Sequence, residues 1–161
     1  MNTRTHPEFS NHERVVFVTD AASGLKAIIA VHSSQLGPAI GGCRMWPYAN
    51  ASDALTDVLR LSRGMTYKNA LAGIASGGGK SVIIGDSKRD KSASLMRAMG
   101  KAIHDLGGLY IAAEDSGTSP SDMALIAEST PYVAGLDHEL GSGHPSPSTP
   151  LGVFLSLKKA V

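Results

Sequence analysis

The sequence predicts an α/β protein, a three-layer sandwich with a mostly parallel sheet and an antiparallel hairpin at its edge. Two segments rich in β-branched residues, 14–19 and 25–31, flank a turn and predict the hairpin. From residue 52 onward, segments with helical spacing alternate with short apolar runs that are typical of buried strands. This alternation favours parallel strands covered by helices.

The first half of the chain supplies the hairpin, a third strand and one helix. The hairpin turn falls at residues 20–24, and Gly37 and Pro38 precede the third strand. An amphipathic helix is expected from residue 52 to about residue 72, because apolar and small residues recur at helical spacing behind a Ser/Asp start. The recurring residues are Leu55, Val58, Leu59, Ser62 and Met65, and the buried face of this helix is expected to carry the leucines.

The second half repeats the order of strand and helix. Residues 81–85 (SVIIG) and 109–113 (LYIAA) predict buried strands, and residues 132–135 (YVAG) predict a further short one. One helix is predicted over residues 92–106, ending at a pair of glycines, and another over residues 120–128, with proline in its first turn.

Residues 135–150 are rich in glycine, serine and proline, which is typical of a loop or an inter-domain connection. A helix then begins, with Thr149 as its N-cap and Pro150 at its first position. We therefore divide the chain into a domain at residues 1–135 and a connection with the start of a helix at residues 136–161. A helix that starts as the sequence ends predicts a longer protein.

Composition argues against several classes of function. The 161 residues carry a net charge of +1 with scattered lysine and arginine, so the electrostatic footprint of a nucleic-acid-binding protein is missing. No run approaches the roughly 20 apolar residues that span a bilayer. The single cysteine, Cys43, suits a reducing cytoplasm, and the six histidines show no metal-ligand spacing. We expect a soluble cytoplasmic protein without a metal, nucleic-acid or membrane partner.

Two lysines, Lys68 and Lys80, raise the question of function, because three glycines directly precede the second. The segment GGGKS resembles the end of a phosphate-binding P-loop, but Ile74 stands where that motif requires its first glycine. The order of elements is also reversed, since a helix precedes the segment and a strand follows it. We therefore expect no binding of nucleoside triphosphates.

Two interpretations of the lysines remain open. In one, Lys68 ends a helix in solvent and the glycines only turn the chain into a buried strand. In the other, the glycines let a ligand approach the backbone closely. Lys80, partly desolvated near a second cation, would then act as a base or nucleophile near neutral pH, while Lys68 would stay charged and hold an anionic group of the substrate.

Five segments together resemble one protein family. Their order and spacing are similar to those of the N-terminal, substrate-binding and oligomerisation domain of the glutamate/leucine/phenylalanine/valine dehydrogenases, especially the leucine, valine and phenylalanine branch. The resemblance implies NAD-dependent oxidative deamination of an apolar L-amino acid to a 2-oxo acid and ammonia. The segments are GPAIGGCRM at 37–45, DALTDVLRLSRGMTYKNALAGI at 53–74, GGGKSVIIGD at 77–86, AEDSGT at 113–118 and GSGHPSPSTPLGV at 141–153.

The resemblance implies three roles in the reaction. Lys68, in GMTYK, binds the α-carboxylate of the substrate, and Lys80, in GGGK, activates water for attack on an imine intermediate. Asp115, in AEDSG, exchanges protons with the substrate amine. One cation then stays charged while its neighbour releases a proton, and a carboxylate relays protons on nitrogen. From the residues alone, Asp115 serves equally well as a turn or capping residue.

The resemblance also implies a substrate pocket. Gly41 and Gly42 let the substrate lie close to the backbone, and Thr149 touches the nicotinamide end of the cofactor. The apolar character of the side-chain pocket favours an aliphatic or aromatic substrate over glutamate. This pocket is lined by Ile40, Met65 and Ala113.

NAD is the cofactor that the family implies, and it is bound mainly on a following Rossmann domain with a G-x-G-x-x-G/A turn. No such turn occurs in this sequence. We expect the chain to be the substrate-binding half of a homo-oligomeric amino-acid dehydrogenase, unable to catalyse the full reaction alone. The alternative is a non-catalytic module that self-associates and binds amino or oxo acids.

Overall fold

The computed structural model describes residues 3–136 and 148–161 of the chain. The described part begins with a short 3-10 helix at Thr3–Thr5. The strands are β1 (Arg14–Asp20), β2 (Leu25–Ser33), β3 (Ala39–Trp46), β4 (Gly77–Ile84) and β5 (Tyr110–Glu114). The α-helices are α1 (Ala51–Leu71), α2 (Ala93–His104), α3 (Pro120–Ala127) and α4 (Ser148–Ala160).

The five strands form one sheet in the order β1-β2-β4-β3-β5. β1 and β2 make the predicted antiparallel hairpin, with Arg14 opposite Val31 and Asp20 opposite Leu25. β4 pairs antiparallel with β2, whereas β3 lies parallel to both of its neighbours, β4 and β5. The predicted fold class is confirmed, because a parallel set of strands carries an antiparallel hairpin at its edge.

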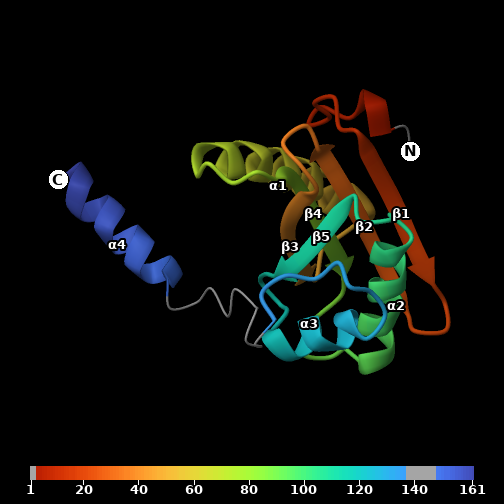
Figure 1. Cartoon of the computed structure of the whole chain (residues 1–161). Coiled ribbons are helices and arrows are strands. Elements are labelled where there is room, and N and C mark those ends of the chain that lie inside the picture. Colours follow the sequence, from red (N-terminus) through yellow and green to blue (C-terminus); the bar gives the residue numbers. More distant parts are fainter. Residues whose placement is uncertain (1–2, 137–147) are drawn as a thin grey trace.

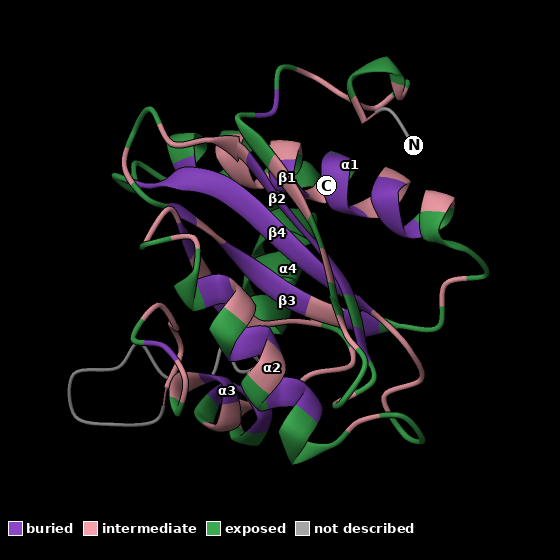
Figure 2. Ribbon diagram, turned by 90° about the vertical axis from the view of Figure 1, so that its right-hand side faces the viewer, coloured by how far each residue is buried: buried purple, intermediate pink, exposed green. Residues whose placement is uncertain are grey.

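Helices cover both faces of this sheet, which gives the molecule three layers (Figures 1 and 2). Side chains of successive strand residues point to opposite faces. Ile28 and Val82 therefore pack into a core under α1, while Ile29 and Ile83 pack into a larger core against α2 and α3. The central strand β4 is buried along almost its whole length (Figure 2).

Polar caps start the helices near the predicted positions. The side chains of Asn50 and Ser92 each accept a hydrogen bond from the backbone amide three residues later. Ser119 and Asp122 form a reciprocal capping box at the start of α3. These bonds satisfy amide groups that the first helical turn leaves without intrahelical partners.

Three details differ from the expectations. β4 begins at Gly77 instead of residue 81, because the glycines pair as strand residues between β2 and β3. Residues 132–135 contribute only a single bridge, between Val133 and Ala112. Thr149 lies inside the first turn of α4 and is not its N-cap, since this helix begins at Ser148. Most of the predicted loop at 135–150 lies outside the described residues.

A buried histidine ties the N-terminal segment to α1. Nδ1 of His12 accepts a hydrogen bond from the Ser10 amide at 3.1 Å, and Nε2 donates to the Leu59 carbonyl oxygen at 3.0 Å. The neutral ring therefore uses both nitrogens. Burial lowers the pKa of His12, the Leu59 hydrogen bond partly opposes this effect, and nearby His32 and Arg63 lower the pKa further.

We expect the chain to lose stability as the pH falls below about 6.5, the ordinary pKa of histidine. Between this pH and the lower pKa of folded His12, the unfolded chain binds a proton that the folded chain does not. The free energy of unfolding therefore decreases as the pH is lowered through this range, and it keeps its full value above about pH 6.5. Urea unfolding over a pH series measures this dependence. His12→Gln should flatten it, His32 should account for the part that remains, and the exposed control His104→Gln should leave it unchanged. An unchanged slope in His12→Gln would contradict this expectation.

Candidate active site

Lys80 lies near the middle of β4, on the face of the sheet that α1 covers. It stands opposite Ala30 of β2, which belongs to the core under α1. Only 5% of its side chain is exposed. An ammonium group this far from water is stable only with a partner of opposite charge.

Asp115, the residue directly after β5, supplies that partner. Nζ of Lys80 donates to Oδ2 of Asp115, and the two side chains form an ion pair. The other carboxylate oxygen, Oδ1, accepts hydrogen bonds from the Ser116 amide at 2.7 Å and from Nε of Arg44 at 3.0 Å. The fold thus brings together the two side chains for which the sequence analysis expected catalytic roles.

The turn after β5 holds Asp115 in place. Oγ1 of Thr118 accepts a hydrogen bond from the Asp115 amide at 2.9 Å. The same hydroxyl donates to the Cys43 carbonyl oxygen at 2.9 Å. Gly117 has a φ of 83°, and a Cβ there would overlap the carbonyl oxygen of Met45. Glycine is therefore required in this turn on both conformational and steric grounds.

Asp115 is held as a carboxylate. Burial by itself raises its pKa, but the charge of Lys80, the hydrogen bonds from Lys80 and Arg44 and the Ser116 amide together hold the pKa below the ordinary value. The site therefore contains an ionised proton acceptor in contact with a protonated amine. This arrangement can exchange a proton with a bound substrate.

Two glycines of β3, Gly41 and Gly42, stand where a Cβ would overlap neighbouring atoms. A Cβ on Gly42 would lie 2.5 Å from Oδ2 of Asp115, so the carboxylate occupies the space that a larger residue would fill. A Cβ on Gly41 would overlap the backbone of Gly79 and lie 3.3 Å from Cγ of Met65. From beneath, the buried hydroxyl of Tyr110 donates to the Gly41 carbonyl oxygen at 2.8 Å.

The other predicted site residues fall into two groups. Ile40 and Ala113 are half-buried, and the period of two along β3 and β5 puts both on the same face as Gly42. Lys68 is exposed in the last turn of α1, and no hydrogen bond or ion pair among the described residues joins it to Lys80. Thr149 is exposed on α4 and lines an open hollow of about 680 Å³ together with Lys68.

Three side chains that the sequence analysis did not single out extend the cluster: Arg44, Asp57 and Tyr48. Nη1 of Arg44 donates to Oδ2 of Asp57 at 2.8 Å, and the hydroxyl of Tyr48 donates to the same oxygen at 2.6 Å. Positive and negative side chains therefore alternate from Lys80 to Asp57. Its place in GGCRM, close to Gly41 and Gly42, is the feature of the sequence that could have indicated Arg44 as a site residue.

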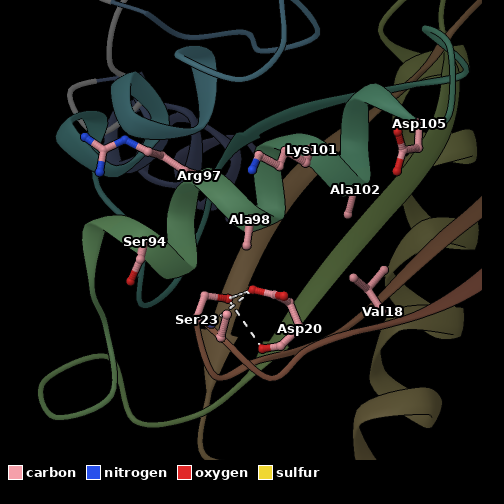
Figure 3. Close-up of a pocket in the computed structure, with 10 residues that line it drawn as sticks. Val18, Asp20, Ser23, Ser94, Arg97, Ala98, Lys101, Ala102 and Asp105 are labelled. Carbon is pink, nitrogen blue, oxygen red and sulfur yellow. Dashed lines mark hydrogen bonds between the residues drawn. The ribbon is translucent and has the colours of Figure 1, made fainter.

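A separate hollow of about 470 Å³ lies on the opposite face of the sheet, between the β1–β2 turn and α2 (Figure 3). Ser23 closes this turn by donating its amide to Oδ2 of Asp20 at 3.0 Å. None of the predicted site residues lines this hollow. Among the described residues, no group of three His, Cys, Asp or Glu side chains is placed to hold a metal ion. No helix in that part of the chain is long and apolar enough to cross a membrane.

Comparison with known proteins gives a consistent result. The sequence pattern of a family described as "Glu/Leu/Phe/Val dehydrogenase, dimerisation domain" matches residues 12–132. The leucine dehydrogenase of Geobacillus stearothermophilus is 54% identical over 154 residues, which cover 95% of this chain and 42% of that protein. The phenylalanine dehydrogenase of Caldalkalibacillus thermarum is 48% identical over 159 residues, which cover 98% of this chain and 43% of that protein.

A solved structure of another amino-acid dehydrogenase has the same fold as this chain. The crystal structure of L-tryptophan dehydrogenase from Nostoc punctiforme superposes with a TM-score of 0.77 and 45% sequence identity, covering 94% of this chain and 42% of that one. The chain thus spans about two fifths of the length of each of these three proteins. Each relative is named as an amino-acid dehydrogenase.

Proposed function

Because this chain belongs to the Glu/Leu/Phe/Val dehydrogenase family, we propose that it is the substrate-binding and oligomerisation part of an NAD-dependent L-amino-acid dehydrogenase. The observation that carries the proposal is the buried ion pair of Lys80 and Asp115 beside Gly42. A module that only assembles has no need of such a pair, because a buried ion pair is weak support for stability. In this proposal residues 1–135 form the domain, and residues 136–161 lead toward the part that binds NAD.

The proposed reaction converts an L-amino acid, NAD⁺ and water to a 2-oxo acid, ammonium, NADH and a proton. Lys68 binds the α-carboxylate, for which its exposed position and its lack of an acidic partner among the described residues leave it available. The substrate amine binds at Asp115, which accepts its proton. NAD, when bound, accepts the hydride from the α-carbon, which leaves an imine.

Lys80 then acts on water in this proposal. A cationic substrate amine at Asp115 replaces Lys80 as the partner of the carboxylate, and a buried amine next to a second cation favours its neutral form. Neutral Lys80 takes a proton from the water that attacks the imine carbon. Asp115 returns a proton to the nitrogen, and the C–N bond breaks as the hydroxyl group of the intermediate gives up its proton to solvent, which releases ammonia and the 2-oxo acid.

The proposed substrate is an apolar L-amino acid. Ile40, Met65 and Ala113 provide the apolar lining that the proposal requires, on the same side of the sheet as Gly42 or against Gly41. The proposed NAD site lies mainly outside this chain, which has no G-x-G-x-x-G/A turn, and Thr149 contacts the nicotinamide end. The dimerisation-domain match supports assembly into a homo-oligomer.

The first test of the proposal is binding by the 161-residue chain. Calorimetric titration with the 2-oxo acid of leucine should give saturable binding that Lys68→Ala weakens at least tenfold, since one charge-assisted contact contributes about 1.5–3 kcal/mol. The exposed control Lys26→Ala should bind as the wild type does. The full-length gene product should reduce NAD with leucine, valine or phenylalanine. Binding by the chain without any turnover by the full-length product would instead favour a non-catalytic amino-acid-binding module.

A further inference from the structure

Arg44 connects two carboxylates at the candidate active site. Its Nε donates to Oδ1 of Asp115 at 3.0 Å, and its Nη1 donates to Oδ2 of Asp57 at 2.8 Å. These partners come from different elements, since Arg44 is in β3, Asp115 follows β5 and Asp57 is in α1. The guanidinium is about a quarter exposed, so much of it is removed from water.

The two oxygens of Asp115 have different partners. Lys80 holds Oδ2, whereas Arg44 and the Ser116 amide hold Oδ1. Rotation of the carboxylate would break bonds at both oxygens together. The hydrogen bonds of Arg44 and the Ser116 amide to Oδ1 therefore hold the carboxylate in the orientation that presents Oδ2 to Lys80.

Arg44 is itself fixed by its second partner. Oδ2 of Asp57 accepts both the Arg44 bond and a 2.6 Å bond from the hydroxyl of Tyr48. Burial raises the pKa of Tyr48, and the hydrogen bond and charge of Asp57 raise it further, so the phenol remains a donor at neutral pH. Asp57 and Tyr48 thus form a fixed support behind the guanidinium.

We propose that Arg44 is a positioning residue that keeps Asp115 turned toward Lys80 and ionised until it accepts the proton of the substrate amine. The proposal rests on the proposed dehydrogenase function, in which Lys80 must release its proton during each turnover. Once Lys80 is neutral, its charge no longer stabilises the carboxylate of Asp115 in this half-buried site. An arginine stays protonated under all these conditions and so supplies the constant positive charge.

The other titratable groups near Asp115 do not replace this charge. Among the described residues on the side of Lys80 and Arg44, the carboxylate of Asp57 pairs with Arg44 and has the wrong sign. On the other side of the sheet, burial raises the pKa of Cys43 to about 11 and the pKa of Tyr110 well above its ordinary value. Both groups are therefore neutral near pH 7.

The test follows the carboxyl group directly. In the 161-residue chain labelled with ¹³C at the aspartate side chains, the Asp115 signal is assigned with Asp115→Asn and titrated in wild type, Arg44→Gln and Arg44→Lys. Arg44→Gln should raise the pKa of Asp115 by about one unit or more, the range expected when a close positive charge is lost. Arg44→Lys should give a smaller rise, because the charge stays but the two-pronged contact is lost.

A matched control separates this effect from a general loss of an arginine. Arg97 forms a 2.6 Å ion pair with Glu128 on the surface, so Arg97→Gln should leave the Asp115 titration unchanged. If Arg44→Gln unfolds the chain, Arg44→Lys carries the test. A pKa of Asp115 that stays within about 0.3 unit of wild type in the folded Arg44 variants would overturn the proposal.

Kinetics of the full-length gene product add a second readout. Arg44→Gln should lower kcat at least tenfold at neutral pH, change KM less than about threefold and move the acid limb of the kcat profile upward by the shift of the Asp115 pKa. A loss of kcat without that displacement would overturn the positioning role. If the wild-type product does not oxidise amino acids, the proposed function fails, while the titration still decides whether Arg44 controls Asp115.

Discussion

Replacing Lys80 by alanine is expected to lower kcat of the full-length protein by roughly 10²–10⁴, the contribution of one general acid–base group. Among the described residues, the other cation that pairs with Asp115 is Arg44, which does not release its proton and so cannot substitute for Lys80. KM for the amino acid should change much less, since in the proposed mechanism Lys68 holds the α-carboxylate. Steady-state rates of NAD reduction with leucine measure both constants.

Lys91→Ala provides the matched control for this substitution. Nζ of Lys91 also pairs with an aspartate, Asp122, at 2.8 Å, but this pair lies at α3 and away from the Lys80 site. We expect Lys91→Ala to cost stability and keep turnover. Lys80→Ala should cost less than the 3–5 kcal/mol of an orphaned buried charge, since Asp115 retains Arg44. Equal turnover in the two variants would contradict the role of Lys80.

Replacing Gly78 by alanine is expected to destabilise the fold strongly. A Cβ on Gly78 would overlap backbone and side-chain atoms of Thr66 in α1. Both elements are fixed, because β4 is paired on both sides and α1 packs across it. We expect a loss of about 3 kcal/mol or more in the free energy of unfolding, at the upper end of the range for overpacking.

Gly64→Ala is the control for the Gly78 variant. Gly64 lies in α1, close in sequence to Thr66, but a Cβ there would meet no atom within 4 Å. Alanine should therefore stabilise the helix by up to about 1 kcal/mol. Urea unfolding of the two variants measures how the same added methyl group changes the free energy of unfolding at a filled position, Gly78, and at an open one, Gly64. A similar small change in both would show that α1 can move away from β4.

The elements with a strong period could be predicted from the sequence. The hairpin has an alternating apolar pattern, and α1 has a helical one with a polar N-cap, Asn50, at its start. The start of β4 was missed because glycine has a low strand propensity, so three glycines in a row predicted a turn. Contacts from other elements decide their conformation here, with Gly78 against α1 and Gly79 against the Tyr110 ring.

The candidate site was predicted in part. Lys80 and Asp115 were found through the resemblance of whole motifs, and the fold brings them into contact. Arg44, Asp57 and Tyr48 were missed because a charged or phenolic residue is usually exposed, and nothing local in the sequence indicates a partner. Arg44 and Asp115 are separated by 71 positions, so their pairing is a property of the sheet order alone.

The strand order also determines when the site can assemble during synthesis. β3 is made before both strands that flank it, because β4 follows α1 and β5 follows α2. A nascent chain that ends within α1 therefore presents both edges of β3 without a partner, and unpaired edges of this kind favour association between chains. Arg44 on β3 can pair with Asp115 only after β5, the last of the described strands, has been synthesised. Pairing of β5 with β3 thus completes both the sheet and the alternating charges of Lys80, Asp115, Arg44 and Asp57 in one late step of folding.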